Sequence, residues 1–369
     1  MIYKNIQGLR ALAALMVVAS HIYWPLVPMR SHWSQPFVSA VGPGGVDLFF
    51  VISGFVVFLS ADRLGRKAVI VGRWRAFREF AVKRVFRIYP AYWVAFAVAS
   101  LLLLTTTAEI APPGIPEKPL WKLLLLIDQP NNRIGAAWTL QFEMYFYTIC
   151  AAAILIFPRR ILLILAAWFA VIFLAWVAGV DYSSSVWLWT IVLEFAFGIV
   201  IALLVERKMS VHGLRFVVVG IGGLLIGAAY YHHQGGFKLP LIWRVICFGL
   251  PSAFIVYGFV AMEIRQAWTF SKGWIRLGDS SYSLYLWHYP LFAVMYVCYV
   301  NMGVAETVPA PILAACSVMI AIAVGFISFH QIERRFNKAG WVAQLAGVEK
   351  RKPPVAHTVA DLKTEALQN

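Results

Sequence analysis

The residues of this sequence that could do chemistry are ionisable side chains standing in otherwise apolar stretches. They are Arg10, His21, Asp47, Glu143, Glu194, Arg244 and His288. An ionisable group within apolar sequence is costly to bury, so it marks a site by default. Histidine can take a proton near neutral pH, and a carboxylate bonded to one imidazole nitrogen holds the other free as a base. The set therefore predicts acid–base chemistry.

Arg10 and His21 have a spacing that fits one face of a helix. They stand about three turns apart, which is roughly 16 Å along the helix axis. Two structural interpretations stay open beside the chemical one. Arg10 could anchor the helix at the inner membrane surface by snorkelling, and His21 could make an interhelical hydrogen bond.

The segment 62–89 is strongly basic and predicts a site for an anion. Its last part places the guanidinium groups of Arg84 and Arg87 on one helix face. Guanidinium groups pair well with phosphate oxygens, which suggests a phosphorylated cytoplasmic ligand such as a nucleotide or coenzyme A. Attraction to anionic lipid headgroups is the other interpretation.

The composition indicates what must position these side chains. Of the 369 residues, 61% are hydrophobic and 13% are charged. A soluble chain of this size cannot hide that much apolar surface, so a soluble monomer, a disordered chain and a disulfide-rich secreted domain are excluded. The net charge of +15 does not indicate nucleic acid, because the positions of the basic residues explain it better. The four cysteines all lie in apolar runs and predict buried thiols, and no Cys/His metal-binding spacing occurs, so we expect no metal.

The hydropathy pattern predicts an all-α integral membrane protein with ten transmembrane helices. The expected spans are residues 8–28, 41–61, 90–108, 137–157, 161–179, 187–205, 214–231, 241–261, 281–300 and 309–329. With the N-terminus placed in the cytoplasm, the inner segments carry 24 of the 32 Lys and Arg residues and the outer segments carry 5. This distribution predicts that both termini are cytoplasmic. A cleaved signal peptide ending near Ala19 is the competing interpretation of the first span.

These spans put His21, Asp47 and Glu143 at one depth, about 9–10 Å below the outer surface. Glu194 could join the same layer. We therefore expect an acid–base cluster in which Asp47 or Glu143 orients His21, while a structural polar network that pins the helices together stays open as the other interpretation.

Arg244 and His288 are expected elsewhere. Arg244 is close to the outer end of its span and predicts a membrane anchor. His288 falls in a span that starts inside, so it is expected nearer the cytoplasmic face, either as a core histidine or as part of a site with Tyr285.

Two segments lie outside the spans. We expect residues 1–336 to form one transmembrane domain and residues 337–369 to form a flexible cytoplasmic tail. The outer connection 109–136 contains the apolar stretch Leu120–Ile127, which is too short to span and is expected to lie on the membrane surface or to fold back against the bundle.

Five motifs in order resemble the acyltransferase 3 family of integral membrane acyltransferases. They are Gln7-Gly8-Leu9-Arg10-Ala11-Leu12-Ala13 with His21, Gly44-Gly45-Val46-Asp47 running to Gly54-Phe55, Arg84-x-x-Arg87-Ile88-x-Pro90, Trp138-Thr139-Leu140-x-x-Glu143, and Ser281-Tyr282-Ser283-Leu284-Tyr285-Leu286-Trp287-His288-x-Pro290. The resemblance runs from about residue 5 to about residue 336.

The resemblance implies ten core helices and transfer of an acyl group, usually acetyl from cytoplasmic acetyl-CoA, to a sugar hydroxyl or another acceptor. His21 then corresponds to the catalytic histidine, and the signal-peptide interpretation is disfavoured. We expect this chain to lack the C-terminal hydrolase-like domain that some members have. Members of this size without that domain resemble polysaccharide O-acetyltransferases of the bacterial inner membrane.

The resemblance and the residues together give the expected site. His21, Asp47 and Glu143 are the expected catalytic residues. Acetyl-CoA is the expected donor, with no resident cofactor or metal, and we expect it to contact Arg10, Ser53, Arg84, Arg87, Tyr285 and His288. The acceptor, a polysaccharide or lipid-linked glycan, is expected to contact Trp138 and Glu194. Membrane lipid and polysaccharide-assembly proteins are the other expected partners, nucleic acid is not, and the oligomeric state stays open.

A transport function is the alternative to enzymatic acyl transfer. The polar layer of His21, Asp47 and Glu143 in a bundle of helices could serve a proton-coupled transporter. Transporters often have repeated halves with broken helices in corresponding positions, and the glycines at 42–45 have no clear counterpart in the second half. Enzymatic acyl transfer is therefore the favoured prediction.

Overall fold

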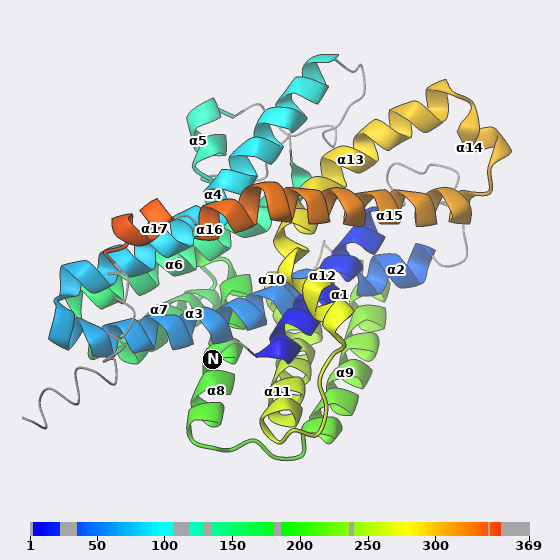
Figure 1. Ribbon diagram of the computed structural model, residues 1–369. Helices are drawn as coiled ribbons and strands as arrows, with labels where there is room; N and C mark the ends of the chain where they lie inside the picture. The colour runs from blue at the N-terminus through cyan, green and yellow to red at the C-terminus, as the bar shows by residue number, and fades with distance from the viewer. Residues whose placement is uncertain are drawn as a thin grey trace, which may run out of the picture.

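The fold is known from a computed structural model, which describes residues 3–22, 35–105, 118–127, 134–180, 186–235, 240–338 and 340–347. Every regular element in these ranges is a helix (Figure 1). The first half contains α1 (Lys4–His21), α2 (Gln35–Val41), α3 (Gly44–Val71), α4 (Arg73–Thr105), α5 (Leu120–Leu124), η2 (Gly135–Ala137), α6 (Trp138–Ile156) and α7 (Ile161–Val177). The second half contains η3 (Val186–Leu188), η4 (Thr190–Val192), α8 (Leu193–Glu206), α9 (Gly213–His233), α10 (Leu241–Arg244), η6 (Val245–Gly249), α11 (Leu250–Ile264), α12 (Lys272–Asp279), α13 (Ser281–Asn301), α14 (Val304–Thr307), α15 (Ala310–Ser328), η7 (Phe329–Glu333), α16 (Arg334–Lys338) and α17 (Gly340–Leu345).

The all-helical membrane architecture agrees with the hydropathy pattern. Within the described ranges, six helical runs are long and apolar enough to cross a membrane: Phe37–Val71, Arg73–Leu102, Gly135–Ile156, Gly213–His233, Leu241–Ile264 and Ala310–Leu345. Each of the ten expected spans also contains a helix, but α1, α7, α8 and α13 are shorter or more polar than these six. The structure therefore supports a multi-pass membrane protein, and the count of ten spans stays a prediction.

Helix α3 is the centre of the bundle, because it contacts α1, α4, α6, α8 and α11. Around this centre, α9 lies alongside α11, and α13 packs against α15. Helix α15 continues through the π-helical turn η7 into α16, so that one long helical run passes from α13 to α4 (Figure 1). This arrangement brings the polar residues of α1, α3, α4, α6 and α13 to one region of the bundle.

Helices α3 and α8 cross with their backbones in close contact. A Cβ atom added to Gly54 of α3 would lie against the carbonyl oxygen of Phe195, and one added to Gly198 of α8 would lie against the carbonyl oxygen of Val51. Membrane helices associate through such small residues, because close backbone approach supplies the packing that a hydrophobic effect cannot supply in lipid.

Gly198→Ala is therefore expected to lower the thermal unfolding midpoint of the protein in detergent. The added methyl group would force the two backbones apart, at a cost of about 1–3 kcal/mol. Gly222→Ala in α9 is the matched control, since a Cβ atom there meets no atom within 4 Å. Equal midpoints for the two variants would show that the α3–α8 crossing tolerates the extra volume.

The apolar stretch Leu120–Ile127 folds back against the bundle, which is one of the two positions expected for it. The side chains of Tyr89, Tyr92 and Trp93 in α4 donate hydrogen bonds of 2.6–3.0 Å to the carbonyl groups of residues 123–125. Helix α5 is thereby fixed beside α4.

Two sequence expectations need correction. Ordered structure continues past residue 337, because α17 packs on α4 and the Arg75 Nε atom donates a hydrogen bond of 3.1 Å to the carbonyl oxygen of Gly347. Residues 348–369 of the expected tail lie outside the described residues. Cys150 and Cys247 are buried as expected, but Cys298 and Cys316 are exposed, since apolar helix faces of a membrane protein also point outward.

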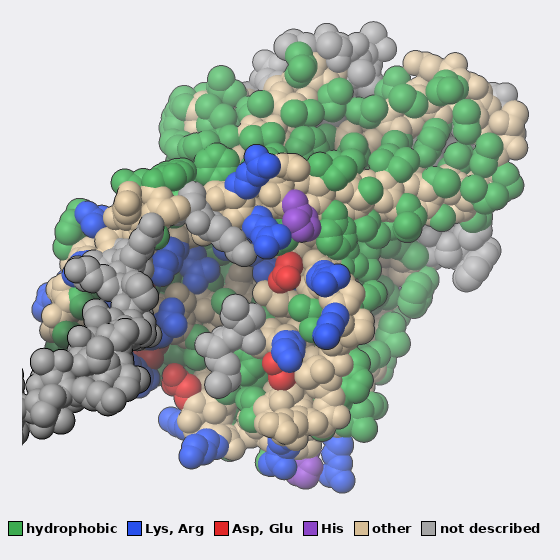
Figure 2. Space-filling view, in the orientation of Figure 1, with side chains coloured by type: hydrophobic (Ala, Val, Ile, Leu, Met, Phe, Trp, Pro, Cys, Tyr) green, Lys and Arg blue, Asp and Glu red, His purple; other side chains and the backbone are tan. Residues whose placement is uncertain are grey.

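The surface is divided by charge. Figure 2 shows Lys and Arg side chains gathered over the lower left of the visible face, whereas hydrophobic side chains cover most of the upper right. Such a division is typical of a chain that leaves one end in water and the remainder in lipid.

Candidate active site

A cavity of about 760 Å³ opens between α1, α3, α4, α6 and α13. Six residues predicted from the sequence line it together: Arg10, Ser53, Arg84, Arg87, Glu143 and Tyr285. Its volume lies within the range of about 300–1,000 Å³ that is usual for small-molecule sites.

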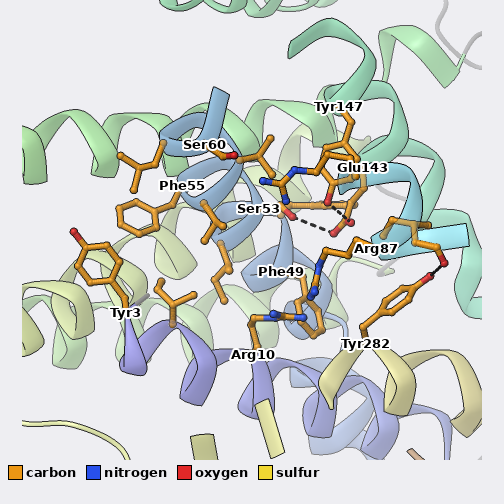
Figure 3. A pocket seen from close by; sticks show the side chains of 18 of the residues that line it. Tyr3, Arg10, Phe49, Ser53, Phe55, Ser60, Arg87, Glu143, Tyr147 and Tyr282 are labelled. Carbon is orange, nitrogen blue, oxygen red and sulfur yellow. Dashed lines mark hydrogen bonds between the residues drawn. The ribbon is translucent and has the colours of Figure 1, made fainter. Parts of the chain in front are cut away.

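Glu143 is held in the cavity by two hydroxyl groups. Ser53 Oγ donates to Glu143 Oε1 at 3.1 Å, and the Tyr147 hydroxyl donates to Glu143 Oε2 at 3.0 Å (Figure 3). Arg10 and Arg87 reach into the same space in Figure 3, and both interact electrostatically with Glu143. The carboxylate of Glu143 therefore belongs to an arginine-rich cluster.

Glu333 is a second carboxylate of this cluster, and the sequence reasoning missed it. Its side chain is buried, accepts a hydrogen bond of 2.9 Å from Ser283 Oγ, and lies 3.5 Å from Arg87 Nη1. The expected tenth span ends at residue 329, so Glu333 lies outside the spans in which ionisable side chains mark a site. The signal that could have found it is Arg87, because a partly buried guanidinium favours a counter-charge nearby.

Arg84 lines the cavity without a carboxylate at hydrogen-bond distance in the described part of the chain. Its guanidinium lies over the rings of Phe80 and Tyr147, 5.4 Å from each centroid, and its Nε atom has no hydrogen-bond partner there. Stacking on aromatic faces holds the group in place and leaves its donors available to a ligand.

The cavity is net positive. Its lining includes five arginines, Arg10, Arg63, Arg66, Arg84 and Arg87, but three acidic residues, Asp62, Glu143 and Glu206. The excess of guanidinium groups favours an anionic ligand, and phosphate groups suit their geometry.

Phe49, Thr139 and Tyr285 line one part of the cavity, which we call the Tyr285 wall. The rings of Phe49 and Tyr285 meet edge to face at 5.9 Å. The Tyr285 hydroxyl lies 2.7 Å from Thr139 Oγ1 and donates to the carbonyl oxygen of Ala136 at 2.7 Å. These bonds hold the tyrosine in place in the lining of the cavity.

His21 and His288 form a pair next to this wall, and neither lines the cavity. His288 is fully buried, with its ring centroid 5.8 Å from that of Tyr285. His288 Nε2 lies 3.4 Å from His21 Nδ1, and the ring centroids are 5.1 Å apart. His21 is partly exposed and does not line the cavity.

The expected depth of His288 was therefore wrong. Counting from Ser281 placed it near the cytoplasmic face, on the assumption that the span begins at the membrane surface. The side chains of Ser281 and Ser283 are already buried, so α13 begins inside the bundle and His288 reaches the level of His21.

The expected contact between His21 and a carboxylate is also not made among the described residues. Both oxygens of Asp47 accept hydrogen bonds from Arg244, from Nε at 2.9 Å and from Nη2 at 2.8 Å. Glu143 is directed into the cavity instead. Equal depth did not bring the three side chains together, because depth along a helix does not fix which face a residue occupies.

Arg244 is accordingly not a surface anchor. Its side chain is buried, donates to the carbonyl oxygen of Pro43 at 3.0 Å and lies over Trp138, 5.7 Å from the ring centroid. Glu194 is fully buried beside this pair and interacts electrostatically with both partners. Trp138 and Glu194, the residues expected to contact the acceptor, thus lie with Asp47 and Arg244.

Comparison with known proteins identifies the relatives of the chain. The acyltransferase domain family matches residues 3–330. The exopolysaccharide production protein ExoZ of Rhizobium meliloti (strain 1021) is 28% identical over 329 residues, covering 81% of this chain and 91% of that protein. The putative membrane-bound transacylase BcsY of Komagataeibacter xylinus is 27% identical over 316 residues, covering 78% and 72%. The peptidoglycan O-acetyltransferase OatA of Listeria monocytogenes is 23% identical over 398 residues, covering 94% and 58%. No solved structure matches.

Proposed function

The chain belongs to the membrane acyltransferase family, and from this premise we propose that it transfers an acetyl group from cytoplasmic acetyl-CoA to a hydroxyl of a polysaccharide or lipid-linked glycan. The observation that carries the proposal is the net-positive cavity lined in part by the Tyr285 wall, with the His21–His288 pair next to that wall. This arrangement offers an anion-binding site on one side of the Tyr285 wall and a general base on the other side.

The donor occupies the cavity in this proposal. The phosphates of acetyl-CoA are anionic, and the available donors of Arg84 and the guanidinium of Arg87 suit them. The thioester then reaches the Tyr285 wall. The basic face in Figure 2 is the cytoplasmic side, where acetyl-CoA is supplied, and the bacterial inner membrane is the location.

The acceptor approaches His21 from the other side, since His21 is partly exposed. A glycan is supported by the names of two relatives, of which one concerns exopolysaccharide production and the other the O-acetylation of peptidoglycan. Polysaccharide-assembly proteins are partners of the same proposal.

His21 acts as the general base. Its Nδ1 atom lies 2.8 Å from the carbonyl oxygen of Val17, which can only accept, so Nδ1 carries the proton and Nε2 is free. The acceptor hydroxyl loses its proton to Nε2 while its oxygen forms a bond to the thioester carbon. The carbon–sulfur bond then breaks, and the imidazolium returns the proton to the leaving thiolate.

Arg84→Ala is expected to raise the KM for acetyl-CoA about tenfold and to change kcat little. A charge-assisted hydrogen bond contributes about 1.5–3 kcal/mol, and Arg84 leaves no carboxylate unpaired when it is removed. Arg87→Ala is expected to act in the same direction but also leaves Glu333 without its partner. Initial rates at varied acetyl-CoA and at varied acceptor measure both.

The exposed Arg78 on the same helix provides the control, as Arg78→Ala is expected to leave both KM values unchanged. A larger rise in the acceptor KM than in the donor KM for Arg84→Ala would contradict the assignment of the cavity to the donor.

Incubation of membranes with acetyl-labelled acetyl-CoA and host glycan tests the function itself. We expect label in the glycan in membranes that contain the protein and none in membranes without it. Movement of a substrate across the membrane in the absence of acetyl-CoA, with no label in glycan, would instead identify a transporter.

A further inference from the structure

We propose that His288 is the positioning residue of His21: its Nε2 shares the hydrogen of His21 Nδ1 with the Val17 carbonyl oxygen and stabilises the positive charge that His21 acquires during transfer. This assignment rests on the proposed function and differs from a donor-binding role for His288. It is carried by the contact of the two rings and by the hydrogen bonds around them.

The proton positions follow from the acceptors. A neutral imidazole has one donor and one acceptor nitrogen. The carbonyl oxygen of Val17, 2.8 Å from His21 Nδ1, requires a hydrogen on that nitrogen. His288 Nε2 faces the same nitrogen at 3.4 Å, and two N–H groups cannot point at each other, so the proposal makes His288 Nε2 the acceptor and puts its proton on Nδ1, a buried nitrogen without a hydrogen-bond partner in the described part of the chain. Catalytic hydrogen bonds are often this long before substrate binds and shorten in the reacting complex.

The carboxylates that could have served His21 are engaged elsewhere. Asp47 is bonded by Arg244 through both oxygens, and Glu143 is bonded by Ser53 and Tyr147. Ser20 Oγ also lies 3.5 Å from His21 Nδ1, but it donates its hydrogen to the Val17 carbonyl oxygen at 2.8 Å. Among the described residues, this leaves His288 in the place that a carboxylate takes in a catalytic triad.

The surroundings of His288 make it a rigid acceptor. The side chain is fully buried on α13, and its ring centroid lies 5.9 Å from that of Phe292 and 6.4 Å from that of Tyr289. Tyr289 also meets the His21 ring edge to face at 5.8 Å. Packed aromatic neighbours hold both imidazoles without adding a competing acid or base.

The pair has its effect when charge develops. His21 takes the acceptor proton on Nε2 and becomes an imidazolium, whose Nδ1–H is a charged donor. Hydrogen bonds from an ionised donor are roughly twice as strong as neutral ones, so the bonds to His288 Nε2 and to the Val17 carbonyl strengthen in the transition state. No proton moves to His288, and the proton balance of the reaction is unchanged.

Two substitutions of His288 test the assignment by kinetics. His288→Leu removes the acceptor and keeps an apolar side chain, and we expect kcat to fall about 100-fold with the KM for acetyl-CoA within about twofold of wild type. His288→Gln places an amide oxygen within reach of His21, and we expect it to recover kcat to within about tenfold. Size-exclusion chromatography in detergent confirms that both variants are folded.

Nitrogen NMR of ¹⁵N-histidine-labelled protein in micelles tests the same claim without any activity. We expect His288 in the wild type to carry its proton on Nδ1. In the His21→Leu variant we expect the His288 ring to populate both neutral tautomers. A His288 proton on Nε2 in the wild type would overturn the proposal, whether or not the protein transfers acetyl groups.

The kinetic outcomes also separate the proposals. A His288→Leu variant with normal kcat and a raised KM for acetyl-CoA would overturn the positioning role and make His288 a donor-binding residue. Absence of transfer in the wild type, together with the expected tautomers, would overturn the proposed function and support the hydrogen-bonded pair.

Discussion

His21→Ala is expected to reduce acetyl transfer to glycan by about 10²–10⁴-fold while the protein still inserts and folds. A positioned general base contributes this much, and His21 Nε2 is the nitrogen left free by the bond from Nδ1 to Val17. The measurement is the rate of label transfer from acetyl-CoA to glycan with purified protein.

His330→Ala is the matched control for this substitution. His330 Nδ1 makes the same kind of bond to the carbonyl oxygen four residues earlier, at 2.9 Å from Phe326, but its side chain is exposed on η7 and has no histidine partner in the described ranges. Its replacement is expected to leave the rate unchanged. Near-normal turnover by His21→Ala would remove the general-base mechanism.

Arg244→Met is expected to have the largest effect on stability, lowering the free energy of unfolding by about 3–5 kcal/mol. It leaves the buried Asp47 carboxylate without its partner, and the buried Glu194 lies beside it. Breaking a buried ion pair on one side costs this much, because an uncompensated charge remains in a low-dielectric interior. Thermal or denaturant unfolding in detergent measures the change.

The double variant Asp47→Leu with Arg244→Met is expected to recover most of that stability, since removing both charges leaves neither unpaired. Arg66→Met, which breaks the exposed pair with Asp62, is expected to cost about 0–1 kcal/mol. A double variant that is folded and retains transfer would show that Asp47 stabilises the bundle and does not orient His21. Loss of transfer in a folded double variant would return Asp47 to the catalytic site.

The fold was predictable because lipid imposes a simple rule on sequence. Long apolar runs must become helices, so each expected span contains a helix. Hydropathy did not show that α3 and α4 also extend through the basic segment 62–89. The motifs suggested that Arg10 and Arg87 contact one ligand, but they put Glu143 with His21 and not with these arginines, whose cavity it shares. The π-helical turn that carries Glu333 was not, since hydropathy does not report where a helix continues beyond its apolar part.

The pairing of the buried charges could not be predicted either, and the reason is different. Hydropathy and residue counting give depth, whereas pairing depends on the rotation of each helix about its axis and on its neighbours. Asp47 and His21 share a depth, yet Asp47 faces Arg244. His288 was placed too near the cytoplasm, because the buried first turn of α13 has no mark in the hydropathy pattern.

The most direct test of the account uses vesicles with the protein reconstituted in the membrane. Glycan acceptor is trapped inside, acetyl-labelled acetyl-CoA is added outside, and label in the trapped glycan is counted. Because the proposed function places the donor in the cavity and the acceptor at the exposed side of His21, we expect label in the trapped glycan with wild-type protein, none with His21→Ala, and no intact acetyl-CoA inside. Intact labelled acetyl-CoA inside the vesicles, or transfer that requires donor and acceptor on the same side, would contradict it.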